Sequence, residues 1–296
     1  MEIKFQSTGS SSNFKTWLEG FIKISNSLLI EIDTTNQQFV AKVFSLGHDI
    51  VEYGKIDFSE AGFEVIAVKN NQQQEITIDE WNAENSENKR IYFPILGQLG
   101  RFIKVMNLYM TSNNYKFNVS FSEYEGTLLA SKAEFKSMAL TMNVRSSELT
   151  EFEEIIKKVS DDNFFNNVAA ISNPMKFSVT PEELKTFITA SGVYSEKAEK
   201  DVLLFQTKKE GESWALYAYD YNNGVYNYNF GYLSESCENP VEVSLPIVRE
   251  NFLKSVNTDD MLVITLDAIE GQNGNKVRLD CGTLFTTIIA AVVTGS

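Results

Sequence analysis

Apolar and polar positions along this chain follow two periods, one typical of amphipathic helices and the other of half-buried strands. Apolar residues at helical spacing predict helices over 13–25, 95–108 and 247–257, and a further helix that begins at Pro181. Alternating runs rich in β-branched and aromatic residues predict most of the rest as strands, at 2–6, 28–32, 39–46, 50–56, 115–121, 128–135, 138–144, 175–179, 202–207, 214–219, 225–232, 241–244, 261–266, 276–280 and 286–293.

The same order of elements occurs twice. Phe93-Pro94-Ile95 precedes a helix and an alternating strand, and Leu245-Pro246-Ile247 precedes the same pair later in the chain. An earlier match, between residues 14–18 and 184–188, again opens a helix. A repeat of this length indicates two copies of one structural unit. We therefore expect a first domain over 1–145, an interdomain connector over 146–174 and a second domain over 175–296.

The start of the second domain's first helix has a strong local signature. Thr180-Pro181-Glu182-Glu183 supplies an N-cap threonine, a proline at the first helical position and a glutamate that can close a capping box. The connector departs from the repeat, and its residues 148–159 predict a short acidic helix. Residues 82–89 predict a polar loop.

Composition narrows the class of protein. The chain has 296 residues, a net charge of −14, two cysteines and one histidine. His48 has no second histidine for a zinc site or a histidine-based triad, and Cys237 and Cys281 lack metal-ligand spacing, so we expect reduced cysteines, no enzyme, no catalytic residue, no metal and no cofactor. No segment has the length of a membrane helix or the pattern of a secretion signal, which predicts a cytoplasmic protein without a membrane partner.

The charge is unevenly distributed. The predicted helices 13–25, 95–108 and 247–257 carry +1, +2 and +1, so the remainder of the chain carries −18. Lys104 and Lys254 fall at equivalent positions on the face away from the core. Basic side chains solvate the outer face of many surface helices, and they also attract phosphate groups. The sequence leaves both interpretations open.

With these features together, the chain resembles the DNA sliding clamps, the family of the eukaryotic proliferating-cell nuclear antigen and of bacteriophage polymerase clamps. The resemblance covers 1–144 and 175–293 and rests on the repeated order of elements and on the two Pro-containing helix starts. It implies an α+β fold with two clamp domains, each with two helices packed on antiparallel sheets. It further implies a homotrimeric ring that encircles duplex DNA without reading its sequence and tethers a DNA polymerase, with a clamp loader as a second partner.

The resemblance also implies sites. Seven basic side chains on or beside the repeat helices are expected to face DNA: Lys15, Lys23, Arg101, Lys104, Lys185, Arg249 and Lys254. A partner peptide is expected near the connector, where the candidate contacts are Phe152, Phe164, Phe165 and Val168, residues that could instead only pack the connector on the sheet. The long connector and the Asn/Lys-rich composition suggest a viral or bacteriophage clamp, which would act in the host-cell cytoplasm or in a replication compartment.

Two other functions remain open. A monomeric or dimeric processivity factor would share the domain but hold DNA on an open surface, and it would need a stronger basic patch because salt screens charges beyond about 8 Å. A β-rich viral structural protein would carry the repeat without any dependence on DNA. The native mass distinguishes these possibilities.

Overall fold

The computed structural model describes residues 1–9, 12–45, 49–85, 90–110, 114–124, 126–145, 167–194, 201–220, 226–268, 276–282 and 284–290. The chain forms two compact units. Unit 1 comprises residues 1–43 and 53–161, and unit 2 comprises 44–52 and 162–296. The turn between two strands of the first half therefore belongs to unit 2, a feature that the domain boundaries expected from the sequence did not include.

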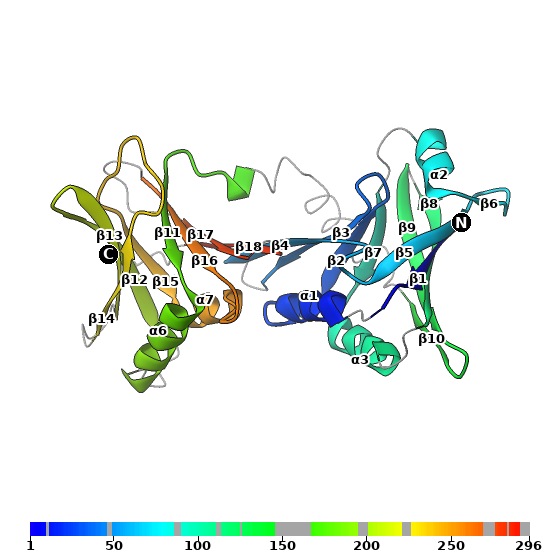
Figure 1. Ribbon diagram of the computed structural model, residues 1–296, viewed down its shortest axis with the longest axis horizontal. Helices are drawn as coiled ribbons and strands as arrows, with labels where there is room; N and C mark the ends of the chain where they lie inside the picture. The colour runs from blue at the N-terminus through cyan, green and yellow to red at the C-terminus, as the bar shows by residue number, and fades with distance from the viewer. Residues whose placement is uncertain are drawn as a thin grey trace. The chain divides into compact units, whose positions relative to one another are not determined.

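Unit 1 is one long sheet with helices on it (Figure 1). The strand order is β4-β3-β2-β7-β9-β8-β1-β5-β6, with β10 added on β9. The elements are β1 (Glu2–Ser7), α1 (Ser12–Ile22), β2 (Leu28–Asp33), β3 (Gln38–Phe44), β4 (Ile50–Asp57), β5 (Phe63–Lys69), β6 (Glu75–Ile76), α2 (Ile78–Glu84), β7 (Ile91–Ile95), α3 (Leu99–Met110), β8 (Lys116–Tyr124), β9 (Thr127–Lys136) and β10 (Thr141–Arg145).

The core of unit 1 is an aromatic cluster. Four strands separate β1 from β3 in the sheet, yet the rings of Phe5 and Phe39 lie 5.5 Å apart. The sheet therefore curls over a shared core. Phe14 of α1 enters the same cluster, 4.8 Å from Phe39 and 5.5 Å from Phe63. Burial of these rings holds α1 against the sheet, since each large aromatic side chain removes extensive apolar area from water.

Unit 2 contains two sheets, ordered β11-β16-β17-β18 and β14-β13-β12-β15. Its elements are β11 (Pro174–Val179), α6 (Pro181–Tyr194), β12 (Val202–Glu210), β13 (Ser213–Asp220), β14 (Asn227–Tyr232), β15 (Ser244–Val248), α7 (Arg249–Ser255), β16 (Leu262–Asp267), β17 (Lys276–Cys281) and β18 (Phe285–Ala290). Phe187 of α6 packs against Phe230 at 4.9 Å and Phe252 of α7 at 5.8 Å.

The two prolines expected to open helices lie in strands. Pro94 is in β7 and Pro246 in β15, so α3 begins at Leu99 and α7 at Arg249. Pro94 stands opposite Leu29 of β2, and Pro246 stands opposite Leu204 of β12. A proline fits a ladder only where its missing N–H would point away from the partner strand, and we infer this orientation for both prolines. The helix expected over 95–108 was therefore too early by four residues.

Several other expectations need correction. Residues 63–69 form the unpredicted strand β5, and the polar loop expected at 82–89 overlaps α2. The strand expected at 241–244 begins instead at Ser244. Strands β7 and β9 pair in parallel, although the sheets were expected to be antiparallel. By contrast, the capping box at Thr180 is confirmed: its N–H and that of Glu183 each donate to the other side chain, at 2.8 and 3.3 Å.

Candidate functional site

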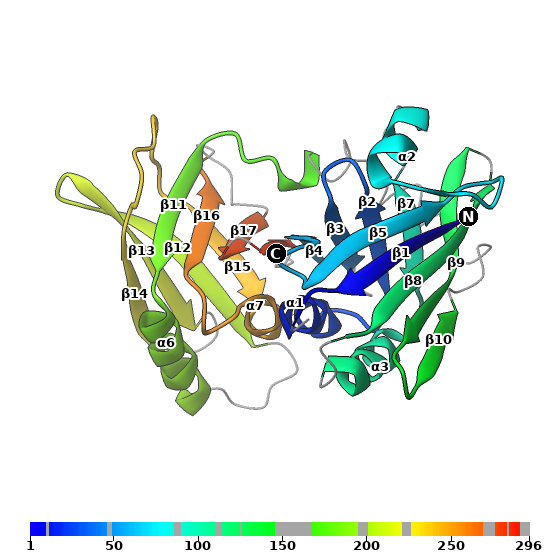
Figure 2. The same cartoon turned by 45° about the vertical axis from the view of Figure 1, so that its right-hand side comes forward.

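The paired helices α1 and α3 of unit 1 form the first candidate site, and both views place them side by side (Figure 1) (Figure 2). A Cβ added at Gly100 of α3 would lie 3.2 Å from the Cδ1 atom of Ile22. A larger residue at this position would therefore require the Ile22 side chain to shift by a few tenths of an ångström.

Asn26 fixes the beginning of α3 on the end of α1. Its main-chain carbonyl accepts a hydrogen bond from the Leu99 N–H at 3.0 Å, and its Oδ1 accepts from the Gly100 N–H at 2.9 Å. Its Nδ2 donates to the carbonyl of Gly97, at 2.7 Å. The free N–H groups of a helix start need such acceptors. The segment after α1 thus supplies the cap of α3, and the two helices are held in one arrangement.

The exposed face of α3 is basic. Phe102, Ile103, Val105, Met106 and Tyr109 are buried, whereas Arg101 and Lys104 are exposed and lie three residues apart on the same side of the helix. Lys23 is also exposed, in the turn immediately after α1 and not within a helix as expected. In the described part of the chain, no carboxylate forms an ion pair with Lys23, Arg101 or Lys104.

The other four basic residues of the expected set are paired. Lys15 lies 3.3 Å from Glu19 and Lys254 lies 2.7 Å from Glu250, each one helical turn away, and Lys185 of α6 lies 3.1 Å from Asp259.

Arg249 differs from the rest of this set because it is half-buried. Its Nη2 donates to Ser191 Oγ at 3.1 Å, and its Nε lies 3.6 Å from Asp201. Since Ser191 is on α6 and Arg249 begins α7, this side chain joins the two helices of unit 2.

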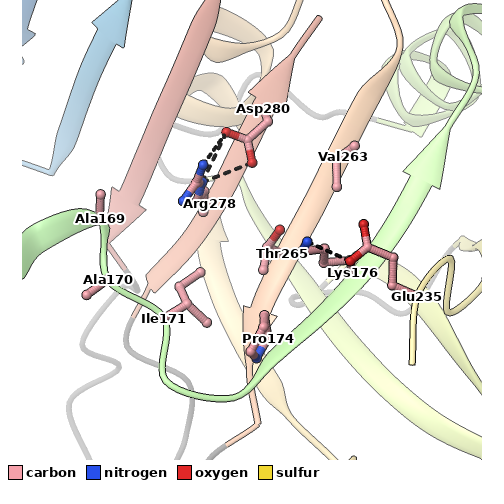
Figure 3. A pocket seen from close by; sticks show the side chains of 10 residues that line it. All are labelled: Ala169, Ala170, Ile171, Pro174, Lys176, Glu235, Val263, Thr265, Arg278 and Asp280. Atoms are coloured by element: carbon pink, nitrogen blue, oxygen red, sulfur yellow. Dashed lines mark hydrogen bonds and ion pairs between the residues drawn. The ribbon is translucent and has the colours of Figure 1, made fainter. Parts of the chain in front are cut away.

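The second candidate site is a hollow of 530 Å³ at the end of the connector (Figure 3). Ala169, Ala170 and Ile171 form one wall, and strands β11, β16 and β17 form the floor. Two ion pairs border it: Arg278 with Asp280, at 2.9 Å, and Lys176 with Glu235, at 2.7 Å. A hollow lined by both apolar and charged side chains can accept a short peptide that has an apolar anchor.

Only one of the expected peptide contacts falls on the described residues. Val168 lies in a helical turn at 167–169, half-buried, and its carbonyl accepts a hydrogen bond from Lys276 Nζ at 2.7 Å. Burial lowers the pKa of Lys276, although nearby Asp267 opposes that shift. Phe152, Phe164 and Phe165, and the acidic helix expected at 148–159, lie outside the described residues.

The charged margin of this hollow was not anticipated. Arg278 and Asp280 alternate on β17, so a period of two in residues 276–280 would have placed them on one face. Lys176 and Glu235 are distant in sequence, and no local pattern brings them together.

Among the described residues there is no group of three side chains that could hold a metal ion, and both cysteines are free. The described helices include none long and apolar enough to span a membrane.

Comparison by sequence finds no matching family model and no matching curated protein. Comparison of structures finds a PCNA from A. fulgidus, solved with the C-terminal region of FEN-1, at TM-score 0.60 and 14% identity over 99% of this chain and 100% of that one. The PCNA2–PCNA3 complex from Sulfolobus tokodaii aligns at TM-score 0.55 and 13% identity, over 98% and 99% of the two chains.

A third match comes from bacteria. The DNA polymerase sliding clamp of Bacillus subtilis aligns at TM-score 0.58 and 10% identity, over 99% of this chain and 64% of that one. These similarities confirm the α+β fold expected from the sequence. At such low identity they establish the fold alone.

Proposed function

We propose that this chain, which has the fold of the DNA sliding clamps, is a non-catalytic processivity factor that encircles duplex DNA as a homotrimer and tethers a DNA polymerase. The observation that carries the proposal is the correspondence of almost the entire chain with complete clamp chains, 99% of this one with 100% of the A. fulgidus PCNA. The correspondence spans both units, which supports the inference that they are two copies of one unit.

The chemistry of α1 and α3 supports contact with DNA. Lys23, Arg101 and Lys104 are exposed cations on a chain whose net charge is −14. Such a chain repels DNA from most of its surface, and a local cluster of cations attracts phosphates without reading bases. Contacts of this kind allow movement along the duplex, as a sliding ring requires.

Strand edges offer a way to close a ring. In the described part of the chain, β10 of unit 1 pairs only with β9, and β14 of unit 2 pairs only with β13. Exposed apolar side chains lie beside each edge: Met138 and Leu140 before β10, and Tyr232 at the end of β14. Pairing β10 of one subunit with β14 of the next would satisfy both edges, and a head-to-tail contact closes when its rotation divides a full turn.

The hollow beside the connector supports recruitment of partners. The A. fulgidus PCNA was solved with the C-terminal region of FEN-1. By analogy, we place a short peptide of the polymerase or clamp loader against Ile171, Val263 and the connector end around Val168. A viral origin and action in a host-cell replication compartment are part of the same proposal, supported by the long connector.

Native mass tests the proposal. Light scattering over a concentration series is expected to give a species of three times 33.4 kDa, about 100 kDa, that dissociates on dilution and is retained on circular but not linear DNA. A strict monomer at high concentration would exclude the closed trimer and favour an open processivity factor. An assembly that does not bind DNA would favour a β-rich viral structural protein.

A matched pair of variants locates the contact. Leu140 beside β10 and Ile66 on β5 are 43% and 44% exposed. We expect Leu140→Asp to raise the midpoint concentration for dissociation about tenfold or more, and Ile66→Asp to leave it unchanged. Equal effects of the two substitutions would place the subunit contact elsewhere.

A further inference from the structure

We propose that unit 1 makes the phosphate contacts of this clamp, through α1, α3 and the turn that joins them, while the helices of unit 2 are electrically neutral toward DNA. The inference rests on the proposed function, and it divides the seven expected contacts into two unequal groups. It assigns the phosphates of the duplex to Lys23, Arg101 and Lys104.

Net charge separates the two helix pairs. In unit 1, α1 is neutral because Lys15 and Glu19 cancel, Lys23 adds one charge and α3 adds two, which gives +3. In unit 2, α6 carries −1 and α7 carries +1, which gives zero. The attraction of a surface for phosphate increases with the number of cations that are not neutralised by nearby acids. The higher net charge of the unit 1 helices therefore favours DNA contact there.

Ion pairing strengthens the difference. Lys185 faces Asp259 at 3.1 Å, Lys254 faces Glu250 at 2.7 Å, and Arg249 is held between Asp201 and Ser191. A lysine that leaves a carboxylate for a phosphate exchanges one anion for another, and the carboxylate left behind repels the DNA, so the net gain is smaller. Lys23, Arg101 and Lys104 have no such partner among the described residues, so each can gain a new interaction.

The exposed stripes of the longer helices agree with this division. On α3, the outward positions include Arg101 and Lys104 and carry no acid. On α6, the outward positions include Glu182, Lys185 and Thr189, and the first turn is acidic. Acidic residues at the start of a helix stabilise it but repel phosphate.

In unit 1, the junction between α1 and α3 also fixes where the basic residues are attached. Asn26 binds the first turn of α3, and Gly100 lets Ile22 approach closely, so Lys23 and Arg101 are attached to one rigid junction. Cations on a fixed scaffold lose less conformational freedom when they bind than cations on free loops do. The junction thus presents its charges in a constant arrangement to a rigid duplex.

Two double variants of equal charge test the inference. R101Q/K104Q and K185Q/K254Q each remove two positive charges from exposed helix positions of the full chain. The probe is a short fluorescein-labelled duplex, and anisotropy is recorded across a NaCl series. We expect R101Q/K104Q to weaken binding at least tenfold and to reduce the slope of log K against log salt by as much as about 1.8, and K185Q/K254Q to change affinity less than about threefold.

A third variant tests whether the carboxylates beside Lys254 and Lys185 weaken binding. In E250Q/D259N, Lys254 and Lys185 lose their carboxylates, so affinity for the duplex should rise and the salt slope should steepen. Circular dichroism and the native mass of each variant check that folding and assembly are retained.

The outcomes separate this inference from the function on which it rests. Equal losses in R101Q/K104Q and K185Q/K254Q, or a larger loss in the latter, would overturn the assignment to unit 1 and leave the clamp proposal standing. If the wild-type protein binds duplex without any dependence on salt, or is not retained on circular DNA, the proposed function fails as well.

Discussion

Equivalent positions of strands β2 in unit 1 and β12 in unit 2 carry side chains of different charge and burial, Glu31 and Gln206. Each of these strands pairs with a strand that contains a proline, Pro94 or Pro246. Two residues before Pro94, Tyr92 stands opposite Glu31. Two residues before Pro246, Ser244 stands opposite Gln206. Glu31 is fully buried, whereas Gln206 is half-buried and donates a hydrogen bond to Ser244 at 3.3 Å.

The surroundings of the two positions differ in charge. Glu31 lies 3.1 Å from Lys42, itself only 3% exposed, and 2.8 Å from Arg90. In unit 2, Lys208 lies over the rings of Tyr217 and Tyr219 instead, at 5.4 and 4.8 Å. Similar strand pairing thus accommodates a buried ion network or a half-exposed cation–π surface. The backbone arrangement permits either, and the neighbouring side chains decide between them.

The largest expected effect comes from breaking the ion network. Glu31→Gln removes the buried carboxylate that Lys42 and Arg90 share, and we expect the free energy of unfolding to fall by about 3–5 kcal/mol. Urea unfolding followed by tryptophan fluorescence measures this, since Trp17 and Trp81 both belong to unit 1. Gln206→Ala is the matched control, with an expected loss of about 1 kcal/mol or less. Equal losses would mean that the network contributes nothing beyond a neutral hydrogen bond.

An intermediate effect is expected at the helix starts. Asn26→Ala removes the side-chain acceptor of the Gly100 N–H and a donor to Gly97, and should cost about 1–2 kcal/mol. Thr180→Ala removes only the local cap of α6, and should cost about 1 kcal/mol. Hydrogen exchange of the Gly100 and Arg101 amides should accelerate in the first variant alone. Unchanged exchange there would show that the Asn26 side chain is dispensable for α3.

The smallest effect depends on pH. Burial favours protonated Asp49, but hydrogen bonds from Ser45 and Asn251 outweigh it and lower the pKa of that carboxyl below 3.8. A lowered pKa gives stability that is present above the unfolded value and is lost as pH falls through the folded one. Asp49→Asn should therefore flatten the decline in stability below about pH 4.

Glu31 should behave in the opposite way. Burial raises its pKa despite Lys42 and Arg90, so its contribution weakens as pH rises above about 4.5. Urea midpoints of wild type, Asp49→Asn and Glu31→Gln between pH 2 and 6 measure the opposite contributions of the two carboxyls. Parallel curves for wild type and Asp49→Asn would exclude a role for Asp49 in acid sensitivity.

Local patterns predicted local structure well. The Thr180-to-Glu183 signature identified the start of α6. The same signature occurs at Thr77 and Glu80, where it closes a capping box, so the start of α2 also has a signal in the sequence. The prolines were misassigned because a proline suits both a first helical turn and an outward position in a strand. Only the pairing with β2 and β12, which the sequence does not display, distinguishes the two.

The sequence predicts which basic residues of the candidate site are exposed, but it does not predict which of them form ion pairs. The exposed positions of Arg101 and Lys104 follow from the helical period. The partner of Lys254 is one turn away and could be anticipated, whereas Asp259 is 74 residues from Lys185. Which cations remain available to phosphate therefore depends on tertiary contacts that join distant parts of the chain.

Pro246 also restricts how the four-stranded sheet can grow. In β15 the backbone groups of alternate residues face away from β12, and Pro246 occupies the middle of that outward row, so an arriving strand would find no donor there. β14, at the opposite border, carries no proline. A second chain should therefore extend this sheet more readily at β14 than at β15, which discourages random stacking of chains into fibres.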